Sequence, residues 1–408
     1  MNLQGEPETR QQLLPSGGGR TKAQGVCYRN LGHRQVISNS GRPCHVGQAG
    51  GKQHRLYWQA TSQTRYGSAV SPRAISCCFV ILCASSVARA EDCYGTHSLG
   101  GCFAALGVTG PAEPGPFRTL SLGQTLPYGS IALNANGWRV SQPAQLVVSS
   151  SDPTGRTIDV VSHATVIDLR AAVGLGHALD LTLGLPIYAD VTGAGSDAIA
   201  TQKPAALNGA ALGDVRIGVR SSLLGASEDA IFRLMLRNEW TLPTGDQSKY
   251  AGDVGPTSTF GLTGAMDVGG WSAALDLGYR AAPAVRFGDV RLGSAAIFGL
   301  GVARDIIEHH VLSIGLEAWA SRVLVNAPTT DVPSDRTVAF PAEWLANVQL
   351  RPRTWAFWFW AGGGGALPLS SREIETTSTF ADAHFIAPSS ARLRLGLGLG
   401  ALFDVAPR

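Results

Sequence analysis

Strict alternation of apolar and polar residues is the most pronounced pattern in this chain, and it is clearest between residues 161 and 190. Every odd position from 167 to 175, and again from 179 to 187, holds an apolar residue, and a short turn at 176–178 separates the two arms. Period two is typical of β-strands with one apolar and one polar face. Each arm exceeds the usual strand of about 5 to 6 residues and approaches the roughly 9 to 11 residues that cross a bilayer. The stretch therefore predicts a transmembrane β-hairpin.

The same alternation recurs along the rest of the chain and predicts about twelve strands. The last is the most regular, because leucines at 393, 395, 397 and 399 alternate with arginine and glycine. The predicted strands are 145–150, 161–175, 179–190, 213–223, 230–242, 256–268, 271–281, 289–304, 311–321, 337–350, 355–360 and 392–404.

The predicted connections alternate in length. They are short after the second, fourth, sixth, eighth and tenth strands and long after the third, fifth, ninth and eleventh, and those after the first and seventh are exceptions. Tight turns at one end and longer loops at the other are typical of outer-membrane barrels. We therefore expect an all-β, up-and-down antiparallel transmembrane β-barrel of about 12 strands over residues 144–408. The alternative, a soluble barrel or sandwich, would leave glycines such as Gly396 on a solvated face, where they weaken a strand without packing.

Composition narrows the class further. The chain has 408 residues, of which 44% are hydrophobic, 15% are charged and 50 are glycine. It contains no run of 18 or more apolar residues, so we expect no membrane-spanning helix. The net charge of +3 is too small to indicate a nucleic-acid partner.

The N-terminal part has the features of an exported protein. Residues 71–90 combine a basic flank, a short apolar run and an Ala-Arg-Ala ending, which together predict a signal peptide cleaved after Ala90. Residues 1–70 show no apolar period, and we interpret them as a disordered leader or a mis-assigned upstream extension. Residues 91–143 are rich in Gly and Pro, and we expect a periplasmic or lumenal segment there.

Two cysteines, Cys93 and Cys102, follow the predicted cleavage site, and the other five precede it. Two cysteines that close a small loop in an exported protein predict a disulfide bond.

Several motifs carry a resemblance to a known family. Leu212–Gly218 reads LGDVRIG, Leu242–Asp246 reads LPTGD with Gly252-Asp253 behind it, and Val161–His163 opens a strand. These stretches resemble the N-terminal barrels of OmpA-family outer-membrane proteins and are similar to the wider set of outer-membrane transporter barrels. The resemblance implies a location in the outer membrane of a Gram-negative bacterium, with membrane lipid and the barrel-assembly machinery as partners.

Two departures from this family affect what the resemblance implies. The chain stops at Arg408, so we expect no periplasmic peptidoglycan-binding domain after the barrel. It also lacks a terminal aromatic residue, and Phe403 is the nearest candidate for the assembly signal.

No catalytic or metal-binding constellation stands out. Ser162, His163 and Asp168 are the nearest approach to a hydrolase trio, but neighbouring strand residues point to opposite faces. His309-His310 falls in a predicted short turn. We expect no enzymatic activity, no cofactor and no metal.

The polar face of the strands would line the lumen, and we expect a narrow passive channel for small solutes that slightly favours anions. The alternative is a non-conducting structural or adhesive barrel that acts through its long extracellular loops. The predicted lumen-lining residues are Asp168, Arg170, Asp180, Asp214, Arg216, Arg220, Arg233, Arg237, Glu239, Asp276, Arg280, Arg291, Glu317, Glu343, Arg392 and Arg394.

Overall fold

The protein is described by a computed structural model, in which the chain divides into two units, residues 1–68 and 69–408. All described residues belong to the second unit. They are 91–92, 110–148, 156–176, 178–195, 206–226, 230–283, 285–287, 290–307, 311–324, 341–352, 356–367, 373–375, 383–386 and 391–405. The predicted leader, the signal peptide with Ala90, the Cys93–Cys102 disulfide and His309-His310 lie outside these residues.

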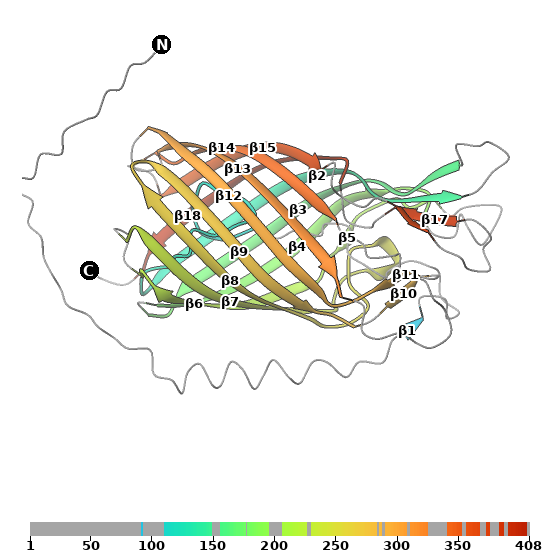
Figure 1. Cartoon of the computed structure of the whole chain (residues 1–408), viewed down its shortest axis with the longest axis horizontal. Helices are drawn as coiled ribbons and strands as arrows, with labels where there is room; N and C mark the ends of the chain where they lie inside the picture. The colour runs from blue at the N-terminus through green and yellow to red at the C-terminus, as the bar shows by residue number, and fades with distance from the viewer. Residues whose placement is uncertain are drawn as a thin grey trace, which may run out of the picture. The chain divides into compact units, whose positions relative to one another are not determined.

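Twelve long antiparallel strands form a closed barrel, and they are tilted in parallel across the view of Figure 1. The ring closes because β2 pairs with β18 on one side and with β3 on the other. The barrel strands are β2 (Ser130–Val148), β3 (Arg156–Gly174), β4 (Leu179–Thr192), β6 (Val215–Leu224), β7 (Phe232–Leu242), β8 (Thr257–Val268), β9 (Trp271–Ala281), β12 (Ala295–Ile307), β13 (Leu312–Val323), β14 (Ala342–Leu350), β15 (Phe357–Ala366) and β18 (Leu393–Asp404). The fold-class prediction is confirmed.

Several short elements lie at the end of the barrel where the long connections are found (Figure 1). They are β1 (Glu91–Asp92), β5 (Ala211–Leu212), the 3-10 helix η1 (Gln247–Lys249), β10 (Val285–Phe287), β11 (Val290–Leu292), β16 (Glu373–Glu375) and β17 (Ala383–Ile386). β5 pairs with β4, β17 pairs with the end of β2 and with β16, and β1, β10 and β11 form a small separate sheet. In the described part of the chain, no helix has the length and apolar character needed to cross a membrane.

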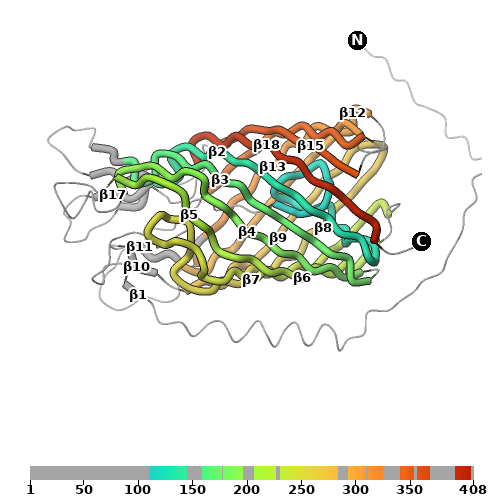
Figure 2. Tube along the Cα trace, turned by 180° about the vertical axis from the view of Figure 1, so that it is seen from behind, coloured from blue at the N-terminus to red at the C-terminus, as the bar shows by residue number. Residues whose placement is uncertain are grey.

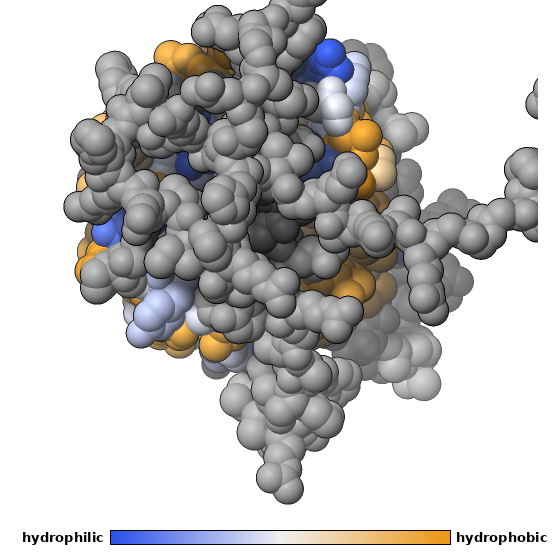
Figure 3. Space-filling model, turned by 90° about the vertical axis from the view of Figure 1, so that its left-hand side faces the viewer, coloured by the Kyte–Doolittle hydropathy of each residue, from blue (hydrophilic) through white to orange (hydrophobic). Residues whose placement is uncertain are grey.

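The apolar face of the strands points outward. On β18, Leu397 is 68% exposed, whereas its neighbours Gly398 and Gly400 are buried inside. In the end-on view of Figure 3, apolar residues gather around the circumference of the barrel. A leucine-covered exterior and a polar interior are what a barrel in lipid requires.

The glycines of β18 are needed because indole rings lie across them. A Cβ added to Gly396 would lie 2.5 Å from the ring of Trp138, and one added to Gly398 or Gly400 would collide with Trp360 or Trp358. The centroids of the Trp138 and Trp360 rings are 4.9 Å apart. Glycine and tryptophan therefore fill this side of the lumen together, with the small residues leaving the depth that the large ones occupy.

The prediction for the first strand was wrong in position. The strand begins at Ser130 rather than at residue 145, and the predicted range overlaps only its last residues, 145–148. Its outward positions include Ala135, Gly137 and Arg139, so the apolar face that marks the other strands is weak here. The register also shifts between Ser141 and Ala144, where a bulge interrupts the alternation.

The predicted eighth strand is two elements. Residues 290–292 form β11, and the barrel strand β12 starts at Ala295. The connection from β9 to β12, residues 282–294, is consequently long, which removes one of the exceptions noted in the sequence. Short turns follow β3, β6, β8, β12 and β14, and long connections follow β4, β7, β9, β13 and β15, so the two ends of the barrel differ as in outer-membrane barrels. The connection after β2, residues 149–155, is the exception, because it is as short as that after β6.

Candidate functional site in the barrel lumen

Residues 110–126, here called the plug segment, lie inside the barrel. Figure 2 shows the blue-green chain before β2 folded within the ring of strands. Phe117, Leu120 and Leu122 form a buried cluster with alanines of β8, β9 and β12. Ala112 and Leu126 form a second cluster with Ala132, Ala172 and Trp358 on other strands. The plug segment thus crosses the lumen and contacts walls on both sides.

Glu317 of β13 anchors the middle of the plug segment. Its carboxylate accepts hydrogen bonds from the backbone N–H of Arg118, Thr119 and Leu120, at 2.5, 2.7 and 3.1 Å. The Thr119 hydroxyl and the Asn347 amide donate to it as well, at 2.6 and 3.0 Å. Five donors surround the fully buried carboxylate, so hydrogen bonds satisfy both of its oxygens.

Arg118 extends from the plug segment toward β14 and β15. Its guanidinium donates to the Gln349 side chain and lies 5.4 Å from the ring centroid of Trp360. Burial lowers the pKa of Arg118 to about 10, partly offset by Glu317 and Glu113. The side chain therefore remains charged at neutral pH.

Glu113 joins the start of the plug segment to the opposite wall. Its carboxylate pairs with Arg220 of β6, which also makes two 2.8 Å hydrogen bonds to Asp180 of β4. Asp180 accepts a further bond, at 3.1 Å, from the backbone N–H of Leu126. One arginine and two carboxylates therefore connect both ends of the plug segment to adjacent strands.

Other lumen arginines are also paired with carboxylates. Arg170 contacts Asp168 at 3.0 Å and Glu239 at 2.8 Å. Arg394 contacts Glu343 at 2.9 Å. Further pairs are Arg237–Asp276, Arg280–Asp253 and Arg233–Asp267. The buried charges compensate one another, as burial in a low-dielectric interior demands.

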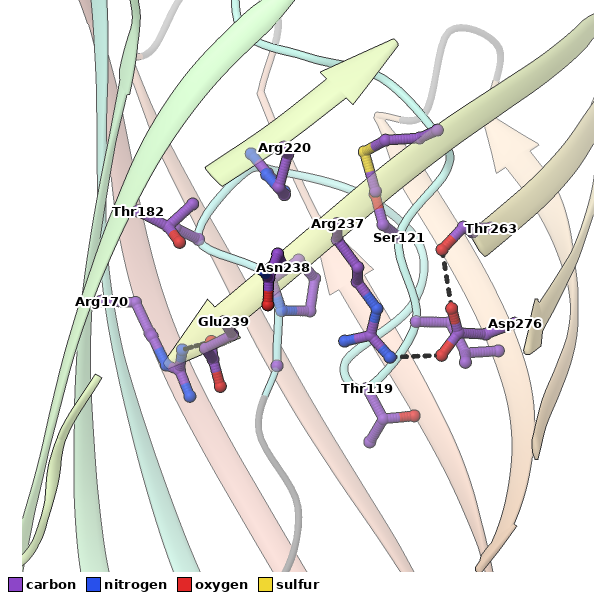
Figure 4. A pocket seen from close by; sticks show the side chains of 15 residues that line it. Thr119, Ser121, Arg170, Thr182, Arg220, Arg237, Asn238, Glu239, Thr263 and Asp276 are labelled. Carbon is purple, nitrogen blue, oxygen red and sulfur yellow. Dashed lines mark hydrogen bonds and ion pairs between the residues drawn. The ribbon is translucent and has the colours of Figure 1, made fainter. Parts of the chain in front are cut away.

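A polar cavity of about 50 Å³ lies between the plug segment and the wall formed by β3, β4 and β6 to β9. Figure 4 shows Arg237 reaching across it to Asp276, with Arg170 and Glu239 at the other side. Thr182, Asn238 and Thr263 contribute further polar groups to its lining. Since a water molecule needs about 10–15 Å³ of such space, the cavity has room for several.

The structure places most predicted lumen residues inside. Arg237, Glu239 and Arg280 are partly buried. Arg392 is exposed just before β18 and donates to Gln142, and its place in the lumen stays a prediction. The side chain of Arg291 is not among those that the structure describes. The buried ones are Asp168, Arg170, Asp180, Asp214, Arg216, Arg220, Arg233, Asp276, Glu317, Glu343 and Arg394.

The sequence analysis left residues 91–143 as a periplasmic or lumenal segment, and it missed the two charged residues of the plug segment. Glu113 and Arg118 are buried, yet they stand in a Gly- and Pro-rich stretch whose apolar residues follow neither a helical nor a strand period. The available signal was the density of apolar residues at Phe117, Leu120 and Leu122 beside isolated charges.

The two motifs singled out in the sequence meet at the mouth of the barrel. Asp214, from LGDVRIG, accepts hydrogen bonds from the backbone N–H of Gly245 at 2.8 Å and of Asp253 at 2.7 Å. A Cβ on Gly245 or Gly252 would lie within 2.9 Å of the Asp214 carboxylate, so both positions need glycine. The motifs therefore hold the connection between β7 and β8 in place.

The Ser162, His163 and Asp168 side chains do not assemble as a trio. Ser162 Oγ lies 3.3 Å from His163 Nδ1, but Asp168 pairs with Arg170 inside the barrel. His163 Nε2 instead contacts the Thr192 hydroxyl at 2.7 Å and Asp190 at 3.5 Å. Among the described residues, no group of three or more His, Cys, Asp or Glu side chains could hold a metal ion.

Comparison with solved structures supports the fold. The chain is similar to an outer membrane channel from Pseudomonas putida F1, with a TM-score of 0.50 and 13% sequence identity over 69% of this chain and 98% of that one. Weaker likenesses include the P. putida toluene transporter TodX, with a TM-score of 0.33 and 9% identity over 69% and 92% of the two chains. Another is the translocator domain of the autotransporter NalP from Neisseria meningitidis, at 0.35 and 9% over 68% and 90%.

At these identities the likeness concerns the fold, and the chain has the fold of an outer-membrane β-barrel. Neither a family model nor a curated protein sequence matches it. The finer resemblance to OmpA-family barrels stays a prediction.

Proposed function

We propose that this protein is a passive channel for small polar solutes in the outer membrane of a Gram-negative bacterium, and that its own plug segment narrows the lumen. The polar cavity between the plug segment and the wall is the observation that carries this proposal. A barrel of twelve strands has a wider lumen than a barrel of eight strands, which side chains alone can fill. The plug segment occupies part of this wider lumen and leaves the polar cavity beside it.

The sidedness of the barrel supports a periplasmic origin for the plug segment. The backbone N–H of Gly129 bonds to the carbonyl of Gly174, at the end of the barrel where the short turn after β3 lies. Short turns face the periplasm in bacterial outer-membrane barrels. The proposal therefore has the chain enter the lumen from the periplasm, with membrane lipid and the assembly machinery as partners and no enzymatic role.

Planar-bilayer recording of protein purified from membranes tests the proposal. We expect discrete conductance steps, smaller than those of an open barrel with the same number of strands because the plug segment occupies the lumen. Absence of steps in repeated insertions, with folding verified, would overturn the proposal.

A non-conducting structural or adhesive barrel is the second candidate. The contacts that favour it are those of the plug segment, which is tied to several walls by Glu317, by Arg220 and by two apolar clusters. The long connections at the opposite end would then carry the function. An absence of conductance steps in planar bilayers, together with cell-surface binding through these loops, would favour this candidate.

A further inference from the structure

Three polar side chains stand in one row on the outer surface of the barrel. The sheet pairs Arg139 of β2 with Thr165 of β3, and Thr165 with Asp190 of β4. The side chains of Arg139 and Asp190 are 47% and 38% exposed. Val140 and Ala164, their neighbours along the chain, are buried, so the row faces outward.

The row lies directly beyond the apolar band of the barrel. On β3 the outward positions from Leu175 to Ile167 are all apolar, and so are those of β4 from Leu179 to Ile187. Each run covers about nine residues, which is close to the roughly 9 to 11 that a strand needs to cross the hydrocarbon. Both runs start at the short turn between β3 and β4, so the row lies at the depth of the lipid headgroups on the side of the long connections.

Other strands place aromatic residues toward this end of the barrel. Tyr279 of β9 and Trp344 of β14 are 42% and 37% exposed near the ends of their strands. Aromatic rings are the common occupants of the membrane interface. On β2, β3 and β4 a guanidinium, a hydroxyl and a carboxylate take their place, so this sector meets the headgroups with hydrogen-bonding groups.

Polar contacts join the row to two further side chains and form what we call the outer polar patch, which consists of Arg139, His163, Thr165, Asp190 and Thr192. Nη1 of Arg139 donates to the Thr165 hydroxyl and lies 3.5 Å from Oδ2 of Asp190. The same oxygen lies 3.5 Å from Nε2 of His163, which contacts the Thr192 hydroxyl at 2.7 Å. These contacts hold the side chains in place on the surface of the wall.

The outer polar patch has accessible groups that its own contacts do not use. Among the described residues, only Nη1 of Arg139 has a partner, which leaves Nε and Nη2 as donors on a half-exposed side chain. Asp190 uses only Oδ2 in the same set, which leaves Oδ1 as an acceptor. A guanidinium group binds phosphate oxygens, whereas a carboxylate repels phosphate and accepts hydrogen bonds from hydroxyl groups. A ligand that satisfies both residues therefore carries a phosphate and hydroxyl groups.

We propose that the outer polar patch binds the headgroup of a phosphorylated glycolipid in the outer leaflet, with the phosphate on Arg139 and sugar hydroxyls on Asp190. The occupant is a lipid rather than free phosphate because the apolar band begins directly below the patch, where Ile167 and Leu169 are 40% and 39% exposed and can contact acyl chains. This inference goes beyond the proposed channel function and rests only on the placement of the barrel in the membrane.

Native mass spectrometry of the purified full-length protein in detergent tests the proposal. The probes are bisphosphorylated lipid A, dephosphorylated lipid A, phosphatidylglycerol and inorganic phosphate. We expect bisphosphorylated lipid A to bind about tenfold more tightly than the other two lipids, and inorganic phosphate not to displace it. Equal binding of either other lipid, or displacement by inorganic phosphate at the same concentration, would overturn the proposal.

Variants place the site on the barrel. Arg139→Gln should weaken binding of bisphosphorylated lipid A about tenfold or more. Arg322→Gln is the matched control, because Arg322 is an exposed arginine at the long-connection end of β13, and it should bind as the unmodified protein does. Equal losses in the two variants would mean general attraction by surface charge and would overturn the site.

Asp190→Ala separates a sugar-phosphate site from a site for phosphate alone. Removing the carboxylate should weaken binding of bisphosphorylated lipid A, because the acceptor for the sugar hydroxyls is lost. A site for phosphate alone would instead bind more tightly once the repelling charge is gone, and that outcome would overturn the proposal. The comparison of lipids on the unmodified protein decides the matter even if a variant does not fold.

Discussion

Glu113 and Arg220 form an ion pair inside the barrel although 107 residues separate them in the chain. Glu113 belongs to the plug segment and Arg220 to the wall, so this pair joins a segment that could leave the lumen to a strand that cannot. Arg220 keeps Asp180 as a second partner whether or not Glu113 is docked. If the plug segment undocks, Glu113 therefore loses its partner, whereas Arg220 retains one.

Glu113→Gln should shift the plug segment toward an undocked state. The substitution removes one partner of a buried pair, but Arg220 retains Asp180, so we expect a loss of about 1–2 kcal/mol of docking free energy rather than the full cost of an unpaired buried charge. Mean open probability in bilayer recordings should rise about five- to thirtyfold. Asp190→Asn, at a half-exposed pair on the rim, is the matched control and should have no effect. Equal open probability in both variants would contradict a holding role for Glu113.

Glu317→Gln should expose the plug segment to protease. The NH₂ group that replaces one carboxylate oxygen cannot accept the hydrogen bonds donated by the backbone N–H groups of Thr119 and Leu120. These N–H groups would then face another donor. We expect a loss of about 2–3 kcal/mol. Arg118 is a trypsin site that is 4% exposed, and cleavage after it should accelerate about thirtyfold or more, as measured by mass spectrometry of the released peptide. Protection equal to that of the unmodified protein would show that the apolar clusters alone hold the segment.

Acidification should undock the plug segment through the same pair as Glu113→Gln. Burial alone would raise the pKa of Glu113, but the Arg220 charge and hydrogen bonds from Arg220 and Ser121 outweigh it, so the pKa lies below the usual 4.5. An acid whose pKa falls on docking stabilises the docked state above its undocked pKa, and that contribution is lost as the pH falls through the lowered value. Asp180, which shares Arg220, is the other acid that faces this group.

Open probability should therefore stay constant from neutral pH down to about pH 5 and rise below pH 4.5, the usual pKa of the group. In Glu113→Gln this rise should be reduced. The measurement is a series of bilayer recordings at stepped pH. An identical pH profile in the two proteins would assign the rise to other carboxylates.

The strands of the barrel could be predicted from the sequence because lipid imposes a one-sided apolar face on each of them. The prediction failed where that face is weak, at Ala135, Gly137 and Arg139 of β2. It also failed at 289–294, where alternation continues into a short strand outside the barrel. The alternation of apolar and polar residues indicates which face of a strand meets lipid. It does not indicate whether a strand belongs to the barrel or to a connection outside it.

The charged residues of the lumen could also be predicted, but their pairing could not. Arg170 lies on β3 and Glu239 on β7, with β4 and β6 between them in the sheet, and the two side chains meet at 2.8 Å inside the curved wall. The plug segment has no period at all, because it runs irregularly through the lumen and its backbone bonds to side chains such as Glu317. The sequence therefore indicated the class of protein, whereas the state of its lumen depends on contacts between distant residues.

Gly398→Val should block folding of the barrel. Its added carbons would collide with the Trp360 ring and break the 2.8 Å bond from the Trp360 indole N–H to Asn136. We expect a loss of about 3 kcal/mol or more, at the upper end of overpacking costs. The measurement is the fraction of protein that migrates as a folded, heat-modifiable band on a gel. Leu399→Val, at the lipid-facing neighbour, should fold normally. A folded Gly398→Val protein would show that the tryptophans can move aside.

Asp214→Ala should loosen the connection between β7 and β8 without affecting the barrel. Its carboxylate is the acceptor for the backbone N–H groups of Gly245 and Asp253, and the substitution leaves both without that partner. Each lost bond costs about 1–3 kcal/mol of local stability, so amide hydrogen exchange at these two residues should accelerate about tenfold or more. Asp214→Asn retains one acceptor oxygen and should protect one of the two amides. Exchange that stays slow at both amides in Asp214→Ala would mean that the pairing of Asp253 with Arg280, together with η1, holds this loop without help from the shared carboxylate.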